Sequence, residues 1–342
     1  MKWLACELHT HTLHSDGAQT LEELAAGAVK LGFEAIALTD HNTMSGLAGK
    51  DVIASQFGLL ILPGMEWTTF HGHMVTVGLS EYVDWRSADH SKIDEGIQEV
   101  HRLGGLAGLA HPFRIGSPAC TGCFWEYEIQ DWSVVDYIEV WSETFASIRT
   151  NNRRAYALWT DRLNEGLRIS ATSGRDWHAQ KETEDPLSVT YLGIPDGELP
   201  TEEQLVNALR EGRASVTMGP LLLLTVSMDG QSYGLGSVLP SSLQAQAKDQ
   251  GELQADITID FSVRPGLWSL PEQNFKLLLC SDRGQELDTE VVWNGEHSND
   301  KQLRLSGLPL SSEPRKWLRA ELWGRMREVN TLIAFTNPAY FD

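Results

Sequence analysis

Short apolar runs and helical patterns alternate along much of this chain. In the first two-thirds, strand-like runs cover residues 4–9, 34–40, 59–66, 106–112, 134–141 and 167–174. Helical patterns lie between or after them, at about residues 21–32, 91–103, 151–166 and 201–212, and the first is expected to have Thr20 as its N-cap. This alternation is typical of βα units around a parallel sheet or barrel.

The chain changes character after about residue 213. No convincing long helix follows, and β-branched or alternating runs recur at 214–219, 221–228, 253–263, 275–281, 318–324 and 331–337. Turn residues such as Asn294-Gly295 separate these runs, so they predict an all-β sandwich of roughly 120 residues. With 342 residues in all, we predict two domains, residues 1–220 and residues 221–342.

Composition excludes several classes of protein. No run approaches the roughly 18 to 20 consecutive apolar residues that a membrane span needs, and the N-terminus lacks a signal-peptide pattern, so a cytoplasmic location is expected. The formal net charge of −20 disfavours non-specific binding to nucleic acid, which depends on Lys and Arg. Four cysteines do not make a disulfide framework in a chain of this length.

Histidines and carboxylates cluster at the ends of the strand-like runs or in the loops beside them. Because His9 and His11 are two residues apart on a strand, their side chains point to one face. In a βα barrel the strand ends that lead into βα loops form one face, where side chains far apart in sequence meet. The candidate metal ligands are His9, His11, Asp16, His41, Glu66, His73, His111, Asp176 and His178.

These residue types indicate a transition-metal site. Imidazole and carboxylate together suit Zn, Mn or Fe, whereas Ca and Mg prefer shells of oxygen alone. A single histidine at a strand end is more often a hydrogen-bonded core residue. The full set in this order, each member at or near a strand end, favours metal binding over that structural interpretation.

Six segments resemble the successive motifs of the PHP (polymerase and histidinol phosphatase) superfamily. They are H-T-H-T-L-H-S-D-G, L-T-D-H-N, P-G-M-E-W, G-H-M, A-H-P and S-G-R-D-W-H. The chain is similar in particular to the CehA/McbA-type metallohydrolase branch, because the similarity continues through L-R-E-G-R-A-S-V-T-M-G-P, to about residue 225. The resemblance implies a distorted (β/α)7 barrel with a three-metal site.

The resemblance also implies which residues bind each of two or three divalent metal ions. His9, His11, Glu66 and Asp176 would bind the first metal, and Asp16, His41 and His178 the second. The third would be bound by Glu66, His73 and His111, with Glu66 as the bridge. His71 lies two residues before His73 and is the alternative to it. Glu66 and Asp176 are also the expected catalytic residues.

The expected activity is hydrolysis of a small phosphate mono- or diester by a metal-activated hydroxide. Arg114 and Arg175 lie close in sequence to His111 and Asp176, so they are expected either to bind the substrate's anionic group or to pair with a nearby carboxylate. One alternative is hydrolysis of a carbamate or amide ester on the same site. Another is a metal-binding or carbohydrate-binding module without catalysis.

Four further features have competing interpretations. Glu139 interrupts an apolar run and either faces the site or makes a structural hydrogen bond. Asp40 is expected to orient a ligand histidine rather than bind metal. His14 is expected to be a polar loop residue rather than a proton donor. Cys120 and Cys123 form a C-x-x-C motif without a second such motif, which disfavours a zinc site.

Overall fold

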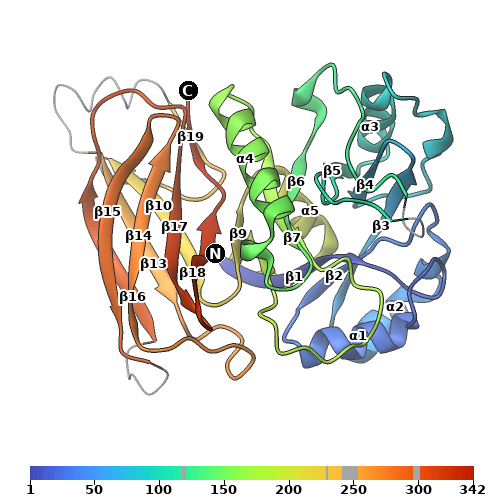
Figure 1. Ribbon diagram of the computed structural model, residues 1–342, viewed down its shortest axis with the longest axis horizontal. Helices are drawn as coiled ribbons and strands as arrows, with labels where there is room; N and C mark the ends of the chain where they lie inside the picture. Colours follow the sequence, from blue (N-terminus) through green and yellow to red (C-terminus); the bar gives the residue numbers. More distant parts are fainter. Residues whose placement is uncertain (118–120, 229, 241–252, 296–300) are drawn as a thin grey trace.

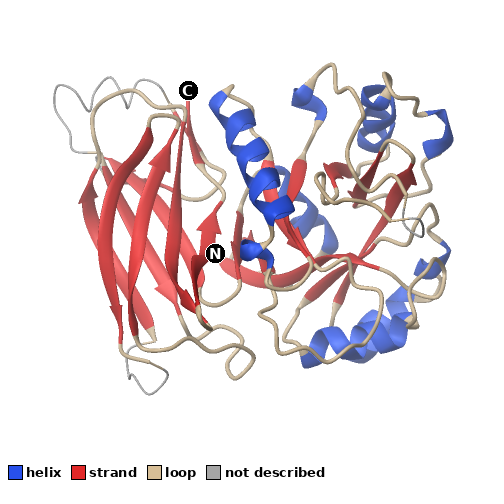
Figure 2. Cartoon of the chain, viewed as in Figure 1, coloured by secondary structure: helices blue, strands red, loops and turns tan. Residues whose placement is uncertain are grey.

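The computed structural model describes residues 1–117, 121–228, 230–240, 253–295 and 301–342. Helices are confined to the first 210 residues of the described chain, where they surround a mixed sheet, and the remainder is built of strands (Figure 2). The structure thus confirms an α/β fold class with a second, all-β region. Among the described helices, none has the length and apolar character needed to cross a membrane.

The sheet of the α/β region runs in the order β8-β1-β2-β3-β4-β5-β6-β7. Its strands are β1 (Lys2–Thr10), β2 (Ala35–Leu38), β3 (Leu60–Thr69), β4 (Gly72–Val77), β5 (Leu106–Leu109), β6 (Tyr137–Ser142), β7 (Ser170–Gly174) and β8 (Val189–Ile194). The sheet curls, so that the segment after β7 returns to β1 through a bridge between Thr10 and Trp177.

Two features distinguish this curled sheet from a regular arrangement of βα units. β4 follows β3 through a tight turn and pairs antiparallel with both β3 and β5, so this step has no crossover helix. β8, a strand that was not predicted from the sequence, pairs antiparallel with β1. The remaining neighbours β1–β2, β2–β3, β5–β6 and β6–β7 are parallel, as the βα pattern predicts.

Five helices cover this sheet (Figure 1). They are α1 (Leu21–Lys30), α2 (Lys50–Phe57), α3 (Ile93–Arg102), α4 (Thr150–Asn164) and α5 (Glu202–Arg210). Thr20 is the N-cap of α1 as predicted, and its hydroxyl and the Glu23 carboxylate form a capping box. The sequence did not predict α2, because none of its side chains is buried and its apolar stripe is therefore weak.

The all-β region consists of two packed sheets. Its strands are β10 (Leu221–Met228), β11 (Gln231–Tyr233), β12 (Val238–Leu239), β13 (Gln254–Asp260), β14 (Gln273–Ser281), β15 (Gly284–Trp293), β16 (Gln302–Pro309), β17 (Trp317–Met326), β18 (Val329–Thr336) and β19 (Ala339–Phe341). One sheet has the order β11-β10-β13-β16. The other is continuous with the sheet of the α/β region, because β9 (Ala214–Thr217) pairs with both β8 and β18. The predicted division between residues 220 and 221 therefore remains a prediction.

A buried ion pair on β17 contacts α4 and so links the two regions where this helix faces the strand (Figure 1). The Arg319 guanidinium lies 3.0 Å from the Glu321 carboxylate, and both side chains are almost fully buried. Arg319 also lies 4.5 Å and 4.9 Å from the ring centres of Tyr156 and Trp159 on α4. The Tyr156 hydroxyl donates to Glu321 at 2.8 Å, so α4 and β17 share one polar network.

Breaking this network by Arg319→Met should lower the free energy of unfolding by about 3–5 kcal/mol, because Glu321 would keep a buried charge without its cation. The double variant Arg319→Met, Glu321→Leu should recover most of that loss. Arg325→Met on the same strand is the control, because the Arg325–Glu328 pair is exposed and is worth less than about 1 kcal/mol. Denaturant unfolding measures all three, and a loss for Arg319→Met no larger than the control would contradict the assignment.

Candidate metal centre

The curled sheet brings all nine predicted ligand residues together in one cluster. β1 delivers His9 and leads into His11, the end of β2 leads to His41, and β3 carries Glu66. β4 carries His73, His111 follows β5, and Asp176 and His178 follow β7. Among the described residues, every group of three or more side chains that could hold a metal ion falls within this set.

The first group consists of His9, His11, Glu66 and Asp176. The Nε2 atom of His9 lies 3.1 Å from Glu66 Oε2 and 3.3 Å from Asp176 Oδ1. The Nε2 atom of His11 lies 3.3 Å and 3.0 Å from the same two oxygens. Two imidazoles and two carboxylates therefore converge on one small volume, as the sequence predicts.

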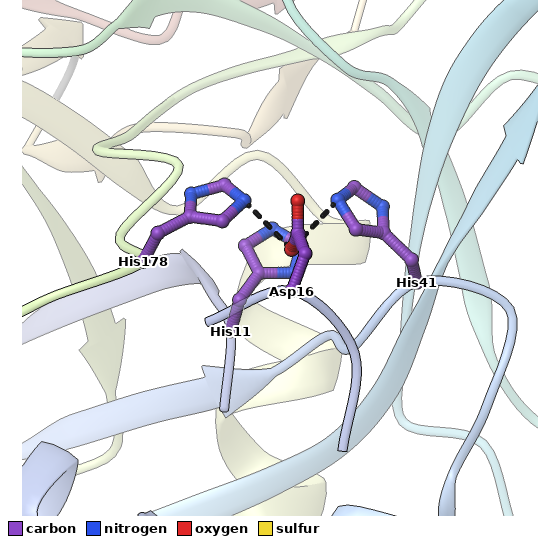
Figure 3. Close-up of side chains that lie close together, drawn as sticks. All are labelled: His11, Asp16, His41 and His178. Carbon is purple, nitrogen blue, oxygen red and sulfur yellow. Dashed lines mark ion pairs between the residues drawn. The ribbon is translucent and has the colours of Figure 1, made fainter. Parts of the chain in front are cut away.

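The second group consists of His11, Asp16, His41 and His178, and Figure 3 shows the imidazoles of His41 and His178 on either side of the Asp16 carboxylate. Asp16 Oδ1 lies 3.3 Å from His41 Nε2 and 3.0 Å from His178 Nε2. The sequence predicts the last three members, whereas the structure adds His11, which belongs to two groups.

The third group consists of Glu66, His73 and His111. Glu66 Oε1 lies 3.0 Å from His73 Nδ1 and 3.3 Å from His111 Nε2, while its Oε2 faces the first group. This is the geometry of a carboxylate that can bridge two ions. His71, the alternative to His73, instead packs its ring 5.5 Å from that of Tyr127.

The donor set fits divalent transition metals. Four buried atoms that can offer a lone pair to a metal lack a hydrogen-bond partner: Nε2 of His9, Nε2 of His11, Oε2 of Glu66 and Oδ1 of Asp176. Buried polar atoms without partners are rare in native proteins and need an explanation. Cations held between imidazole and carboxylate would satisfy these atoms together.

Electrostatic coupling within the cluster is strong. Burial opposes protonation of His9, but the charges of Glu66, Glu139 and Asp176 outweigh it and raise the pKa of that imidazole well above its usual range. Burial also opposes protonation of His41, yet Glu66 and Asp16 raise its pKa to about 10. Despite burial, His9 and His41 hold the pKa of Glu66 well below its usual range. The carboxylates thus favour positive charge at His9 and His41, which bound cations would supply instead of protons, whereas burial lowers the pKa of the His11 imidazole to about 4.

A second layer of side chains orients the ligands. The Glu139 carboxylate lies 2.7 Å from His9 Nδ1, so Glu139 faces the site, which was one of its two interpretations. This contact leaves Nε2 of His9 directed at the cluster. Gly174 is required beside this pair, since a Cβ there would lie 2.5 Å from the Cβ of His9. The hydroxyl of Thr68, a residue not predicted from the sequence, forms a hydrogen bond with His41 Nδ1.

Asp40 does not orient a ligand histidine, so that expectation is wrong. Its carboxylate accepts hydrogen bonds at 2.7 Å from the backbone N–H of Thr12 and from the hydroxyls of Thr12 and Ser15. Asp40 therefore shapes the loop that carries Asp16. His14 lies at the surface, with Nδ1 2.8 Å from the Ser45 hydroxyl, as expected for a polar loop residue. Cys120 lies outside the described residues.

The two predicted substrate arginines occupy different places. Arg114 reaches the cluster, where its guanidinium pairs with Asp176 Oδ2 and, at 2.8 Å, with Glu143 Oε1. The Arg175 guanidinium instead stacks 4.2 Å from the centre of the Trp177 ring, and that ring belongs to the core beneath α1. Arg149, not predicted from sequence, pairs with Glu143 Oε2 at 2.7 Å.

A cavity of about 520 Å³ adjoins the metal-ligand cluster near Arg149 and Asp176. Asp176 and His178 form part of its wall, together with the basic side chains of Arg149, Arg175 and Lys181 and the acidic side chains of Glu143 and Glu182. We call it the cationic cavity after its three basic side chains. Glu143, which lines this cavity, has a φ of 66°. This left-handed backbone conformation is uncommon for a non-glycine residue and often marks a functional site.

Comparisons with known proteins agree with this geometry. Residues 7–106 match the family model described as PHP domain. The chain is 30% identical over 122 residues to a 3',5'-nucleoside bisphosphate phosphatase of Chromobacterium violaceum, which covers 34% of this chain and 40% of that protein. It is 25% identical over 161 residues to a 5'-3' exoribonuclease of Escherichia coli, covering 42% of this chain and 55% of the relative. The chain thus spans about half the length or less of these two curated relatives.

A crystal structure from Bacteroides vulgatus has the same fold along nearly the whole chain. It is a two-domain protein containing a predicted PHP-like metal-dependent phosphoesterase, with a TM-score of 0.52 and 15% identity, and the match covers 98% of this chain and 95% of that one. At this identity the likeness concerns the fold alone. The match to the PHP domain model covers residues 7–106, and six of the ligand residues lie within it: His9, His11, Asp16, His41, Glu66 and His73.

Replacing Glu66 by Gln keeps the size of the side chain but removes a charge and one ligating oxygen. Because Glu66 contacts two of the ligand groups, Glu66→Gln should weaken metal binding by at least about tenfold, with less metal retained after dialysis against a metal buffer. Elemental analysis measures this, and circular dichroism checks folding. The exposed Glu128→Gln variant is the control, and equal metal content in both variants would rule out the bridging role.

Proposed function

We propose that this protein is a metal-dependent phosphoesterase that hydrolyses a small phosphate mono- or diester. The observation that carries the proposal is the set of three overlapping ligand groups, joined through Glu66 and His11. Such a set would concentrate positive charge where a phosphate must bind. The PHP match and the phosphatase relative support this activity rather than the binding-module alternative.

We propose that two or three Zn, Mn or Fe ions occupy these groups, with the ligands assigned as the sequence motifs imply. His9, His11, Glu66 and Asp176 would hold the first ion, and Asp16, His41 and His178 the second. Glu66, His73 and His111 would hold the third. Bound divalent cations would supply a water of lowered pKa and neutralise the charge that develops on the phosphate.

The protein's own side chains would position the substrate around that centre. Arg114 already lies against Asp176, so its guanidinium is within reach of an anionic group bound at the cluster. Glu143 holds Arg114 and Arg149 on its two oxygens and thereby fixes both guanidinium groups beside the cationic cavity. We keep Arg175 as a second proposed substrate contact, because it lines the same cavity.

Within the superfamily we propose the CehA/McbA-type branch, on the motifs that continue to about residue 225. Carbamate or amide ester hydrolysis on the same centre is the nearest alternative, since the same ligands could activate water against a carbonyl carbon. We propose a small molecule rather than nucleic acid as substrate. A net charge of −20 opposes the approach of a polyanion, although one relative is an exoribonuclease.

Turnover by protein reconstituted with Zn or Mn tests the proposed reaction. Phosphate monoesters, phosphate diesters, aryl carbamates and a short single-stranded RNA are offered in parallel. We expect phosphate release from at least one small ester and its loss on chelation of the metal. Hydrolysis of carbamates alone would replace the phosphoesterase proposal by its alternative, and preference for RNA would overturn the small-molecule substrate.

A further inference from the structure

A second cavity adjoins the ligand cluster, and it has a different chemical character. Its volume is about 350 Å³, within the range of about 300–1,000 Å³ typical of ligand pockets. We call it the aromatic cavity. Its lining residues include Thr68, Phe70, His71, Trp85, Thr121 and Tyr127.

Two lining residues connect the aromatic cavity directly to the ligands. The Thr68 hydroxyl bonds His41 Nδ1, and the Thr121 carbonyl oxygen lies 3.3 Å from His73 Nε2. A substrate whose reacting group lies at the cluster could therefore extend one substituent into this cavity. The cationic cavity adjoins the cluster through different residues, Asp176 and His178.

Rings form much of the wall of the aromatic cavity. Tyr127 is buried, and its hydroxyl donates to Thr69 Oγ1 at 2.9 Å, which fixes the ring next to that of His71. Trp85 is only half-buried in the same wall. Phe70 is 79% exposed on the turn between β3 and β4, so packing in the protein core does not account for it.

The charge of the wall is already neutralised. Among the described lining residues, Arg86 is the only Lys or Arg, and its guanidinium donates to the Asp84 carboxylate at 2.8 Å and 2.9 Å. The cavity thus presents ring faces and hydroxyl groups rather than a free ionic partner. Its complement is a flat, uncharged, aromatic group, because such groups stack on aromatic side chains.

We propose that the aromatic cavity binds a planar aromatic substituent of the ester, an aryl ring or a nucleobase, while the phosphate lies at the ligand cluster. This inference rests on the proposed phosphoesterase function and narrows its substrate class. Alkyl phosphates of similar charge lack the ring and should gain nothing from Trp85 or Phe70.

Kinetics of Trp85→Leu and Phe70→Ala test the proposal. The substrates are 1-naphthyl phosphate, adenosine monophosphate and glycerol 2-phosphate, so that the arms separate an aryl ring, a nucleobase and an alkyl group. In each variant KM should rise about tenfold for the preferred aromatic ester, with kcat and the constants for glycerol 2-phosphate little changed. Trp132→Leu is the matched control, since Trp132 is also half-buried in a 3-10 helix but lies outside the cavity.

The same rise in KM for glycerol 2-phosphate, or unchanged KM for both aromatic esters, would overturn the proposal. A binding measurement separates this failure from failure of the proposed function. If no ester is turned over, calorimetric titration of Zn-loaded protein with 1-naphthyl phosphate still reports on the cavity. Weaker binding in Trp85→Leu and Phe70→Ala than in Trp132→Leu supports it, and equal binding in all three overturns it.

Discussion

The carboxylate of Glu66 is the interaction on which the site depends, because five imidazoles lie within 3.3 Å of its two oxygens. Oε2 faces His9, His11 and His41, and Oε1 faces His73 and His111. A buried charge is tolerated only with compensating partners, so this one carboxylate requires the strands around it to present cationic or metal-loaded imidazoles. The curled sheet meets that requirement by bringing the ends of several strands to one place.

The all-β region contributes to the site from a distance. β18 bonds the loop before α4 through Thr331 and Ser147, whose hydroxyl oxygens are 2.7 Å apart, and the same loop carries Glu143 and Arg149. With Arg319 buried against α4, the β region supports the helix as well as the loop that lines the cationic cavity. Among the described residues, the candidate metal-ligand groups all come from the α/β region, and the contacts through Thr331 and Arg319 link the β region to it.

The sequence predicted the features that follow from local patterns. The nine ligand candidates were visible because each lies at or near an end of an apolar run, and Thr20 was visible as an N-cap residue before a helical pattern with acidic residues in its first turn. Contacts between distant segments were not visible. Asp40 was misjudged because nothing local shows that its partners are Thr12 and Ser15, and α2 was missed because it buries no side chain. For the same reason neither Thr68 nor Arg149 could be identified, since their roles depend on which loops meet after folding.

The number and positions of the bound metal ions decide whether Glu66 joins the ligand groups into one metal centre. Anomalous X-ray diffraction from crystals of Zn- or Mn-loaded protein locates each ion and identifies its ligands. We predict two or three ions in the ligand groups, with Glu66 bound to two of them when the third position is filled. A single ion, or ions bound at sites that exclude Glu66, would contradict this prediction.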